Sequence, residues 1–151
     1  MRVGFIAVLS AICLLVSNVS LWAHCEIPCG IYGDEQRLEA LKENITTIEK
    51  SMRQIGELSG DSNNINQVVR WVDNKENHAD QIREIVTQYF MTQRVKIPAA
   101  DDAQAQKSYT KQLALLHQMM VYAMKCKQTT DLAYVEKLRG LLGEFRQVYG
   151  K

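Results

Sequence analysis

The sequence predicts an all-α protein, an antiparallel up-down-up-down four-helix bundle. Apolar residues recur at spacings of three and four along four long stretches, which is the period of one helix face. The 151-residue chain has only two prolines, and both lie outside those stretches. Short links rich in Gly, Asp, Asn and Thr separate the stretches, and short links place consecutive helices antiparallel. No stretch of useful length shows the two-residue alternation of a half-buried strand.

The first predicted helix begins at Asp34 and ends at Gly60. Asp34 is a plausible N-cap, and Glu35 lies in the first turn, where the helix dipole favours carboxylates. Apolar residues follow at spacings of 3, 4, 3, 4 and 3 and predict one packed face: Leu38, Leu41, Ile45, Ile48, Met52 and Ile55. Gly60 belongs to a Ser-Gly-Asp-Ser-Asn-Asn turn that ends the helix.

The second predicted helix runs from about Asn64 to Lys96, and Pro98 marks the break after it. Its predicted inward face comprises Ile65, Val68, Val69, Val72, Ala79, Ile82, Ile85, Val86, Tyr89 and Phe90. Polar residues interrupt this face over residues 73–77. Polar groups in the middle of a helix are either solvated or face a site, and the sequence leaves both possibilities open.

The third and fourth helices are predicted over about 103–127 and 132–149, with residues 129–131 forming a capped turn between them. The third presents Tyr109, Leu113, Leu116, Met120 and Ala123 to the core. The fourth presents Leu132, Val135, Leu138, Leu141 or Leu142, Phe145 and Val148. We interpret Cys126 and the methionines at 119, 120 and 124 as core residues rather than ligands. His78 and His117 have no neighbouring ligands and are interpreted as structural or surface residues.

Residues 1–23 have the layout of a secretory signal peptide. Arg2 supplies a positive start, residues 3–16 are almost continuously apolar, and Ala23 suits the cleavage position. The apolar run is short for a membrane span, although an uncleaved N-terminal anchor is the alternative. Cleavage after Ala23 would leave residues 24–151, exported to the periplasm or secreted, with His24 as the new N-terminus.

The balance of charge argues against a nucleic-acid binder. The whole chain carries a formal net charge of +1, and Arg2 is the charged residue of the leader. The remaining chain is therefore neutral, whereas a nucleic-acid-binding protein usually shows a basic excess. After cleavage no membrane partner is expected either.

The stretch directly behind the leader, residues 24–32, is predicted to bind a metal, and we call it the hook. It offers the α-amine and imidazole of His24, the thiols of Cys25 and Cys29, and the backbone amide between the first two residues. Amine, amidate and thiolate ligands favour square or tetragonal Ni(II) or Cu(II), whereas zinc prefers a tetrahedral set. Because thiolate and amidate are strong electron donors, they would bring a Ni(III)/Ni(II) couple into biological range. Pro28 stiffens the chain before Cys29.

Other interpretations of the hook remain open at this point. Cys25 and Cys29 could form a local disulfide in an exported protein, which would make the chain a purely structural bundle. The same N-terminus could also serve an exported nickel or copper carrier that binds metal without turnover.

The hook sequence HCEIPCGIY resembles the H-C-x-x-P-C-x-x-Y nickel hook of the nickel-containing superoxide dismutases. The resemblance continues through residues 32–40, the start of the first helix. It implies a four-helix bundle, a nickel ion, assembly as a homohexamer, and superoxide as the substrate. The implied reaction is disproportionation of superoxide to dioxygen and hydrogen peroxide by Ni(III)/Ni(II) cycling.

The resemblance also implies the ligand set. His24 would ligate through its amine and its imidazole, Cys25 through its thiolate and backbone amide, and Cys29 through its thiolate.

Three further residues receive implied roles around the metal. Tyr32 matches the tyrosine that guards the open face of the nickel, and Tyr89 matches a second tyrosine near the site. Glu39 matches a glutamate that hydrogen-bonds the axial imidazole, although its spacing from Tyr32 is one residue shorter than in some members. The basic partner of this glutamate has no clear match, and Lys75 and Arg70 are the candidates.

Overall fold

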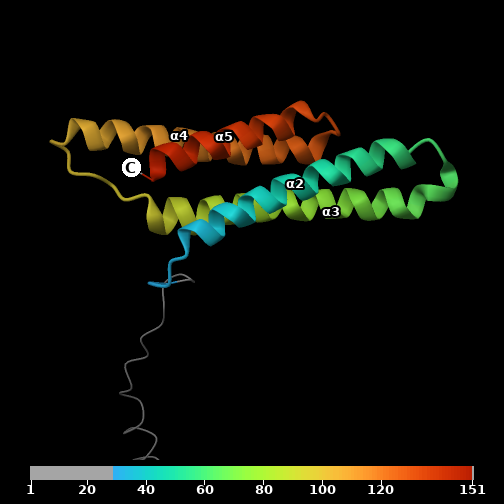
Figure 1. The fold of residues 1–151 in the computed structure, drawn as a ribbon, viewed down its shortest axis with the longest axis horizontal. Helices are drawn as coiled ribbons and strands as arrows, with labels where there is room; N and C mark the ends of the chain where they lie inside the picture. The colour runs from blue at the N-terminus through green and yellow to red at the C-terminus, as the bar shows by residue number, and fades with distance from the viewer. Residues whose placement is uncertain (1–28, 151) are drawn as a thin grey trace, which may run out of the picture. The chain divides into compact units, whose positions relative to one another are not determined.

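The structure is a computed structural model in which residues 29–150 are described, and the helices among these residues form the predicted four-helix bundle. The long helices are α2 (Asp34–Leu58), α3 (Ile65–Glu84), α4 (Ala103–Gln128) and α5 (Ala133–Tyr149). A short 3₁₀ turn, η1 (Ser62–Asn64), precedes α3, and a π-helix, η2 (Ile85–Arg94), continues it. Figure 1 shows two antiparallel pairs, α2 with α3 and α4 with α5. Further contacts of α3 with α4 and of α2 with α5 close the bundle. The described residues contain no strand, so the predicted fold class is confirmed.

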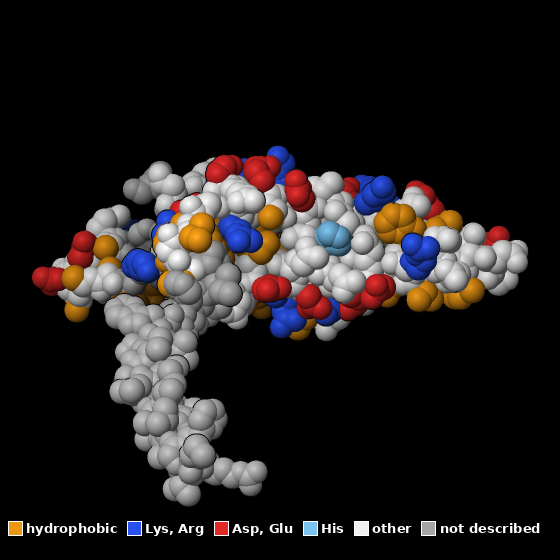
Figure 2. All heavy atoms as spheres, turned by 90° about the horizontal axis from the view of Figure 1, so that it is seen from below, with side chains coloured by type: hydrophobic (Ala, Val, Ile, Leu, Met, Phe, Trp, Pro, Cys, Tyr) orange, Lys and Arg blue, Asp and Glu red, His pale blue; other side chains and the backbone are white. Residues whose placement is uncertain are grey.

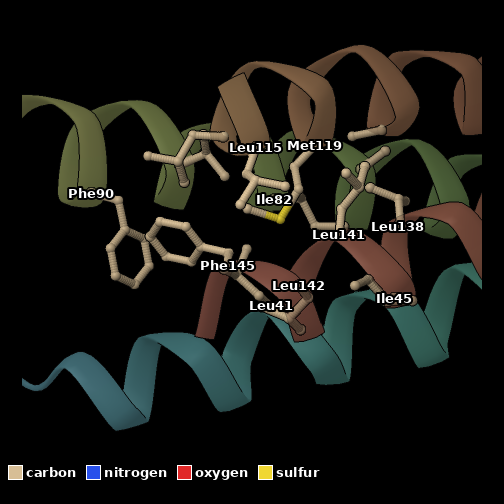
Figure 3. Packing of buried hydrophobic residues seen from close by; sticks show 14 of the residues in the cluster. Leu41, Ile45, Ile82, Phe90, Leu115, Met119, Leu138, Leu141, Leu142 and Phe145 are labelled. Carbon is tan, nitrogen blue, oxygen red and sulfur yellow. The ribbon is translucent and has the colours of Figure 1, made fainter. Parts of the chain in front are cut away.

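All four helices contribute side chains to one continuous hydrophobic core. Figure 3 shows Leu41, Ile82, Met119 and Phe145 pointing toward one another from different helices. The largest fully buried side chains are Phe90, Phe145, Leu41, Ile45, Ile48, Met52, Ile82, Leu115, Leu116, Met119, Leu138 and Leu141. Burying a side chain of this size contributes about 1.5–3 kcal/mol, so packing rather than helix propensity stabilises these helices.

Carboxylate side chains accept backbone hydrogen bonds at the starts of two helices. Asp102 accepts a hydrogen bond from the Ala105 amide at 2.8 Å and caps α4. Asp131 accepts from the Ala133 amide at 2.9 Å in the turn before α5, although Leu132 rather than Asp131 takes the N-cap position of that helix. The prediction that Asp34 is the N-cap of α2 is wrong. Gly33 takes that position, and Asp34 is the first helical residue. Its side chain is therefore available for other partners.

The predicted inward face of the second helix is wrong at its beginning. Ile65, Val69 and Val72 are exposed, with 64%, 59% and 38% of their surface accessible. In Figure 1 the joined ends of α2 and α3 extend past the α4–α5 pair, so no second pair of helices covers this part of α3. Figure 2 shows hydrophobic side chains gathered at that end of the molecule. Periodicity identified the apolar stripe but could not tell where the partner helices end.

The core face of α4 is also broader than predicted. Leu115 and Met119 are fully buried beside Leu116 and Ala123, whereas the predicted Tyr109, Leu113 and Met120 are only partly buried. In α5 both Leu141 and Leu142 are buried, so the choice between them was unnecessary.

The polar interruption at residues 73–77 joins helices to one another. Asn74 donates to the Ser51 hydroxyl on α2 at 2.9 Å. Lys75 is buried, and its ammonium donates to the carbonyl of Lys127 at 2.6 Å and to that of Thr129 at 3.4 Å, at the C-terminus of α4. Burial lowers the pKa of Lys75. Because the last carbonyls of a helix lack partners within the helix, this lysine caps α4 from a neighbouring helix.

Among the other residues assigned to structure, Met119 is fully buried and Met120 is partly buried, whereas Met124 is 43% exposed, so its interpretation as a core residue is wrong. Cys126 is fully buried, and burial raises the pKa of its thiol to about 11. His78 lies against Asn44 on α2, with 2.6 Å between Nδ1 and the amide oxygen, and His117 is exposed on α4. No helix within residues 29–150 combines the length and the hydropathy needed to cross a membrane.

The predicted continuous helix over 64–96 changes its hydrogen-bond pattern at Ile85 and ends at Arg94. Over Ile85–Arg94 the chain forms a π-helix, in which each amide bonds the carbonyl five residues earlier. The Val95 amide, for example, donates to the Phe90 carbonyl at 2.8 Å. Such helices are rare and often lie at functional sites.

Candidate metal centre

Of the three predicted metal ligands, Cys29 is the one within the described residues. It is exposed and forms no disulfide with another described residue. Gly30 follows with a φ of +73°, in the left-handed region that favours glycine, so the chain turns directly after the thiol. His24 and Cys25 lie outside the described residues. Within residues 29–150 no group of three His, Cys, Asp or Glu side chains could hold a metal, so this part of the chain offers no rival centre.

The structure brings the two predicted tyrosines together. Tyr32 lies just before α2 and is partly exposed, whereas Tyr89 on η2 is buried. Their ring centroids are 6.2 Å apart and the ring planes meet at 73°, an edge-to-face contact. Residues separated by more than fifty positions in the sequence therefore form one aromatic pair.

Asp34 lies at the centre of a cluster that sequence reasoning missed. Its Oδ1 accepts from the Tyr89 hydroxyl at 2.6 Å and from Arg94 Nε at 2.8 Å. Its Oδ2 accepts from a terminal nitrogen of Arg94 at 2.6 Å and from the Tyr149 hydroxyl at 2.9 Å. Both oxygens are thus fully used, and α2, η2 and α5 meet on one carboxylate. We call Tyr32, Asp34, Tyr89, Arg94 and Tyr149 the Asp34 cluster.

Arg94 connects the carboxylate to the exposed tyrosine. Its guanidinium carbon lies 4.2 Å from the centroid of the Tyr32 ring, within the range of a cation–π contact. A second arginine, Arg37, lies 5.3 Å from the Tyr89 ring centroid. Each of the two tyrosines therefore faces a cation.

The electrostatics of the cluster keep the carboxylate charged and the phenols protonated. Hydrogen bonds from Arg94, and then from the two tyrosines, lower the pKa of Asp34 to about 2. Burial, followed by the hydrogen bond to Asp34, raises the pKa of Tyr149 to about 12 and also raises that of Tyr89. At neutral pH both phenols are consequently hydrogen-bond donors.

Glu39 has basic partners different from those considered. Arg146 on α5 donates to Glu39 at 2.6 Å and also pairs with Glu35, while Lys42 pairs with Glu39 at 3.1 Å. Hydrogen bonds from Arg146 and then Lys42 lower the pKa of Glu39.

The earlier candidates for that partner, Lys75 and Arg70, are therefore wrong. The Lys75 ammonium is engaged by the carbonyls at the end of α4. No local pattern points to Arg146, because the contact joins residues 107 positions apart through the packing of α5 on α2.

A hollow of about 730 Å³ opens beside the Asp34 cluster. Its lining residues are Asp34, Glu35, Leu38, Arg94, Arg146, Tyr149 and Gly150. It contains the two arginines that pair with the carboxylates at the start of α2. The surface next to the tyrosines is therefore highly polar, although each charge has an opposite partner.

The comparisons identify the family. A family model described as nickel-containing superoxide dismutase matches residues 19–151. No significant match was found among curated proteins or among solved structures. The matched region includes the hook and the whole bundle, and its description agrees with the metal that the donor set of the hook favours. The chain therefore belongs to the nickel-containing superoxide dismutases, a family of oxidoreductases.

Proposed function

We propose that this protein disproportionates superoxide by Ni(III)/Ni(II) cycling at the hook, after cleavage has exposed His24. The observation that carries the proposal is the hook sequence HCEIPCGIY, with Tyr32 three residues after Cys29 and its ring against Tyr89. Membership of the family supports the nickel and the substrate.

The residues proposed to hold the metal are His24, Cys25 and Cys29. Their donors fit nickel because thiolate is a soft ligand and amidate is a strong electron donor, and a thiolate forms readily beside a metal. When bound, nickel supplies a one-electron couple. Cys29 is exposed, as a ligand that must receive a metal from solution needs to be.

The overall reaction consumes two superoxide ions and two protons and yields one dioxygen and one hydrogen peroxide. One superoxide loses an electron and the other gains it, so the protein must admit a small anion and deliver protons. The Tyr89 hydroxyl is held protonated by Asp34, and the Tyr32 side chain is partly open to solvent. We propose that Tyr89 helps to orient the residues of the site, and that Tyr32 lies at the entrance through which superoxide reaches the metal. Glu39, held by Arg146, is the proposed support for the His24 imidazole.

The thiolates of such a site need protection from the product. Peroxide oxidises thiolates to sulfenic acid and beyond. A bulky aromatic pair at the entrance is expected to limit the access of peroxide while admitting superoxide. Tyr32 is the proposed guard because it is the more exposed member of the pair.

We further propose that the mature protein is exported, periplasmic or secreted, and assembles as a homohexamer. The leader sequence supports export, and the family resemblance supports the hexamer. Export and exposure of the amine ligand would then be a single proteolytic event.

The decisive experiment compares the mature chain beginning at His24 with a chain carrying one extra Gly before His24. The extension converts the proposed amine ligand into an amide and leaves the bundle unchanged. We expect nickel bound in equal moles and superoxide turnover for the mature chain, and loss of turnover for the extended chain. Turnover by the extended chain, or zinc alone in the mature chain, would contradict the proposal.

Variants of the same mature chain distinguish the proposed enzyme from a metal carrier and from a purely structural bundle. Cys25→Ser and Cys29→Ser are each expected to abolish nickel binding without changing helix content. A carrier would bind nickel or copper, release it readily and show no turnover. A structural bundle would keep a Cys25–Cys29 disulfide, which mass spectrometry detects as a loss of two hydrogens.

A further inference from the structure

We propose that Arg94 is a positioning residue for Tyr32, presented by the π-helix η2 and held by Asp34. The inference rests on the proposed function in one respect: Tyr32 matters because it is the proposed entrance residue. The placement itself is argued from the described residues alone.

The contacts around Tyr32 come from η2. The Tyr32 side chain precedes the first turn of α2, so no helix fixes it. The Arg94 guanidinium lies 4.2 Å from its ring centroid, and the Tyr89 ring meets its edge at 6.2 Å. Because 43% of Tyr32 is exposed, these few contacts decide where the ring lies.

Arg94 can hold a ring because it is itself held rigidly. Its two donors meet the two oxygens of Asp34 at 2.8 and 2.6 Å, a bidentate pair. Such a pair fixes the plane of the guanidinium, and a planar guanidinium stacks on an aromatic face as an ammonium does not. Asp34 is in turn fixed by the hydroxyls of Tyr89 and Tyr149.

The π-helix makes this arrangement possible. Tyr89 and Arg94 are five residues apart and both bond Asp34. In an α-helix each residue turns about 100°, so residues five apart would point about 140° away from each other. In a π-helix the hydrogen bond joins residues five apart, and their side chains lie on the same side of the helix. The hydrogen bonds of Ile85–Arg94 therefore explain how one carboxylate receives both side chains.

Two variants test the role of Arg94. Arg94→Lys keeps a cation near Asp34 but removes the planar fork, and Arg94→Ala removes both. The matched control is Arg83→Lys, since Arg83 forms a 3.0 Å pair with Asp80 on the solvent side of α3, half exposed and outside the cluster. Circular dichroism verifies that each variant folds. If Arg94→Ala does not fold, the test uses Arg94→Lys alone.

The first readout is the rate of nitration of each tyrosine by tetranitromethane, mapped by mass spectrometry in the mature chain with and without nickel. We expect Tyr32 to react about two- to fivefold faster in both Arg94 variants, the ratio that a cation–π contact of about 0.5–1 kcal/mol corresponds to. Tyr122 on α4, whose ring contacts Tyr134 of α5, serves as the internal reference. An unchanged Tyr32 rate in both Arg94 variants would overturn the proposal.

The second readout concerns the reaction and does not follow from a merely structural role. In nickel-loaded protein at equal nickel content, we expect Arg94→Lys to lose activity to added hydrogen peroxide several times faster than Arg83→Lys, with each rate of loss expressed relative to that variant's own initial turnover. Equal peroxide sensitivity despite a released Tyr32 would refute the link to the entrance. If the wild-type chain bound no nickel, the proposed function would fail, but the nitration result would still decide whether Arg94 positions Tyr32.

Discussion

Replacing Asp34 by Asn is expected to destabilise the bundle strongly at neutral pH. The substitution keeps the size of the side chain but removes the charge that accepts from Arg94, Tyr89 and Tyr149. The pKa of Asp34 falls from an ordinary value of 3.8 to about 2, and each unit corresponds to about 1.36 kcal/mol. With 29% of the side chain exposed, solvent reduces this, so we expect a loss of about 2 kcal/mol.

The pH dependence fixes the origin of that loss. Because the folded protein lowers the pKa of Asp34, the carboxylate stabilises the fold fully above the unfolded pKa near 3.8. This contribution disappears as the pH falls from about 4 toward about 2. The difference between wild type and Asp34→Asn should therefore be constant from pH 7 to about 5 and shrink below pH 4.

The free energies of unfolding of wild type and Asp34→Asn are compared by urea unfolding followed by circular dichroism at pH 7, 5, 4 and 3, and their melting temperatures by thermal unfolding at pH 7. At neutral pH the melting temperature should fall by about 5–10 °C for a domain of this size. The control is Asp80→Asn, since Asp80 forms half-exposed pairs with Arg83 and Lys127 and should cost less than about 1 kcal/mol. Equal losses in the two variants at pH 7, or a loss for Asp34→Asn that is as large at pH 3 as at pH 7, would refute the reasoning.

Three further predictions test the bundle. Phe145→Ala removes a fully buried ring that contacts Phe90 and Tyr149, and it should cost about 3–5 kcal/mol in urea unfolding, against under 1 kcal/mol for an exposed substitution. Lys75→Met takes the ammonium away from two carbonyls at the end of α4 and should cost about 1–3 kcal/mol, so a neutral effect would contradict the capping role. In the folded metal-free protein Cys126 should resist a thiol reagent that labels exposed Cys29, because burial raises the pKa of Cys126 to about 11; labelling of both at equal rates would show that α4 opens readily.

The fold was predictable because each helix has its own local pattern of apolar residues at spacings of three and four. The 3–4 spacing from Leu38 to Met52 matches buried positions of α2 directly, and the predicted turn at residues 129–131 lies where α4 ends and α5 begins. Errors arose where a boundary is set by other helices. Ile65 and Val72 have helical spacing and an apolar character, but nothing in their own segment reveals that α4 and α5 stop short of them.

The candidate site was predictable only in part. The hook is contiguous, so its motif is visible in nine residues, and Tyr32 comes with it. Tyr89 was reached through the family resemblance, and its contact with Tyr32 agrees with that choice. Asp34 and Arg94 carried no signal, because their importance arises from one ion pair across sixty residues and from a π-helix. Hydrophobic periodicity cannot detect a π-helix, since Ile85, Val86, Tyr89 and Phe90 fit an α-helical face equally well.

The buried Lys75 links three parts of the chain that would otherwise move separately. Its side chain starts on α3 and ends on the carbonyls that lead from α4 into the final turn. The other end of α5 carries Arg146 and Tyr149, which hold the beginning of α2. The two ends of α5 are therefore anchored by different neighbours: the turn before it through Lys75 on α3, and its last residues through the start of α2.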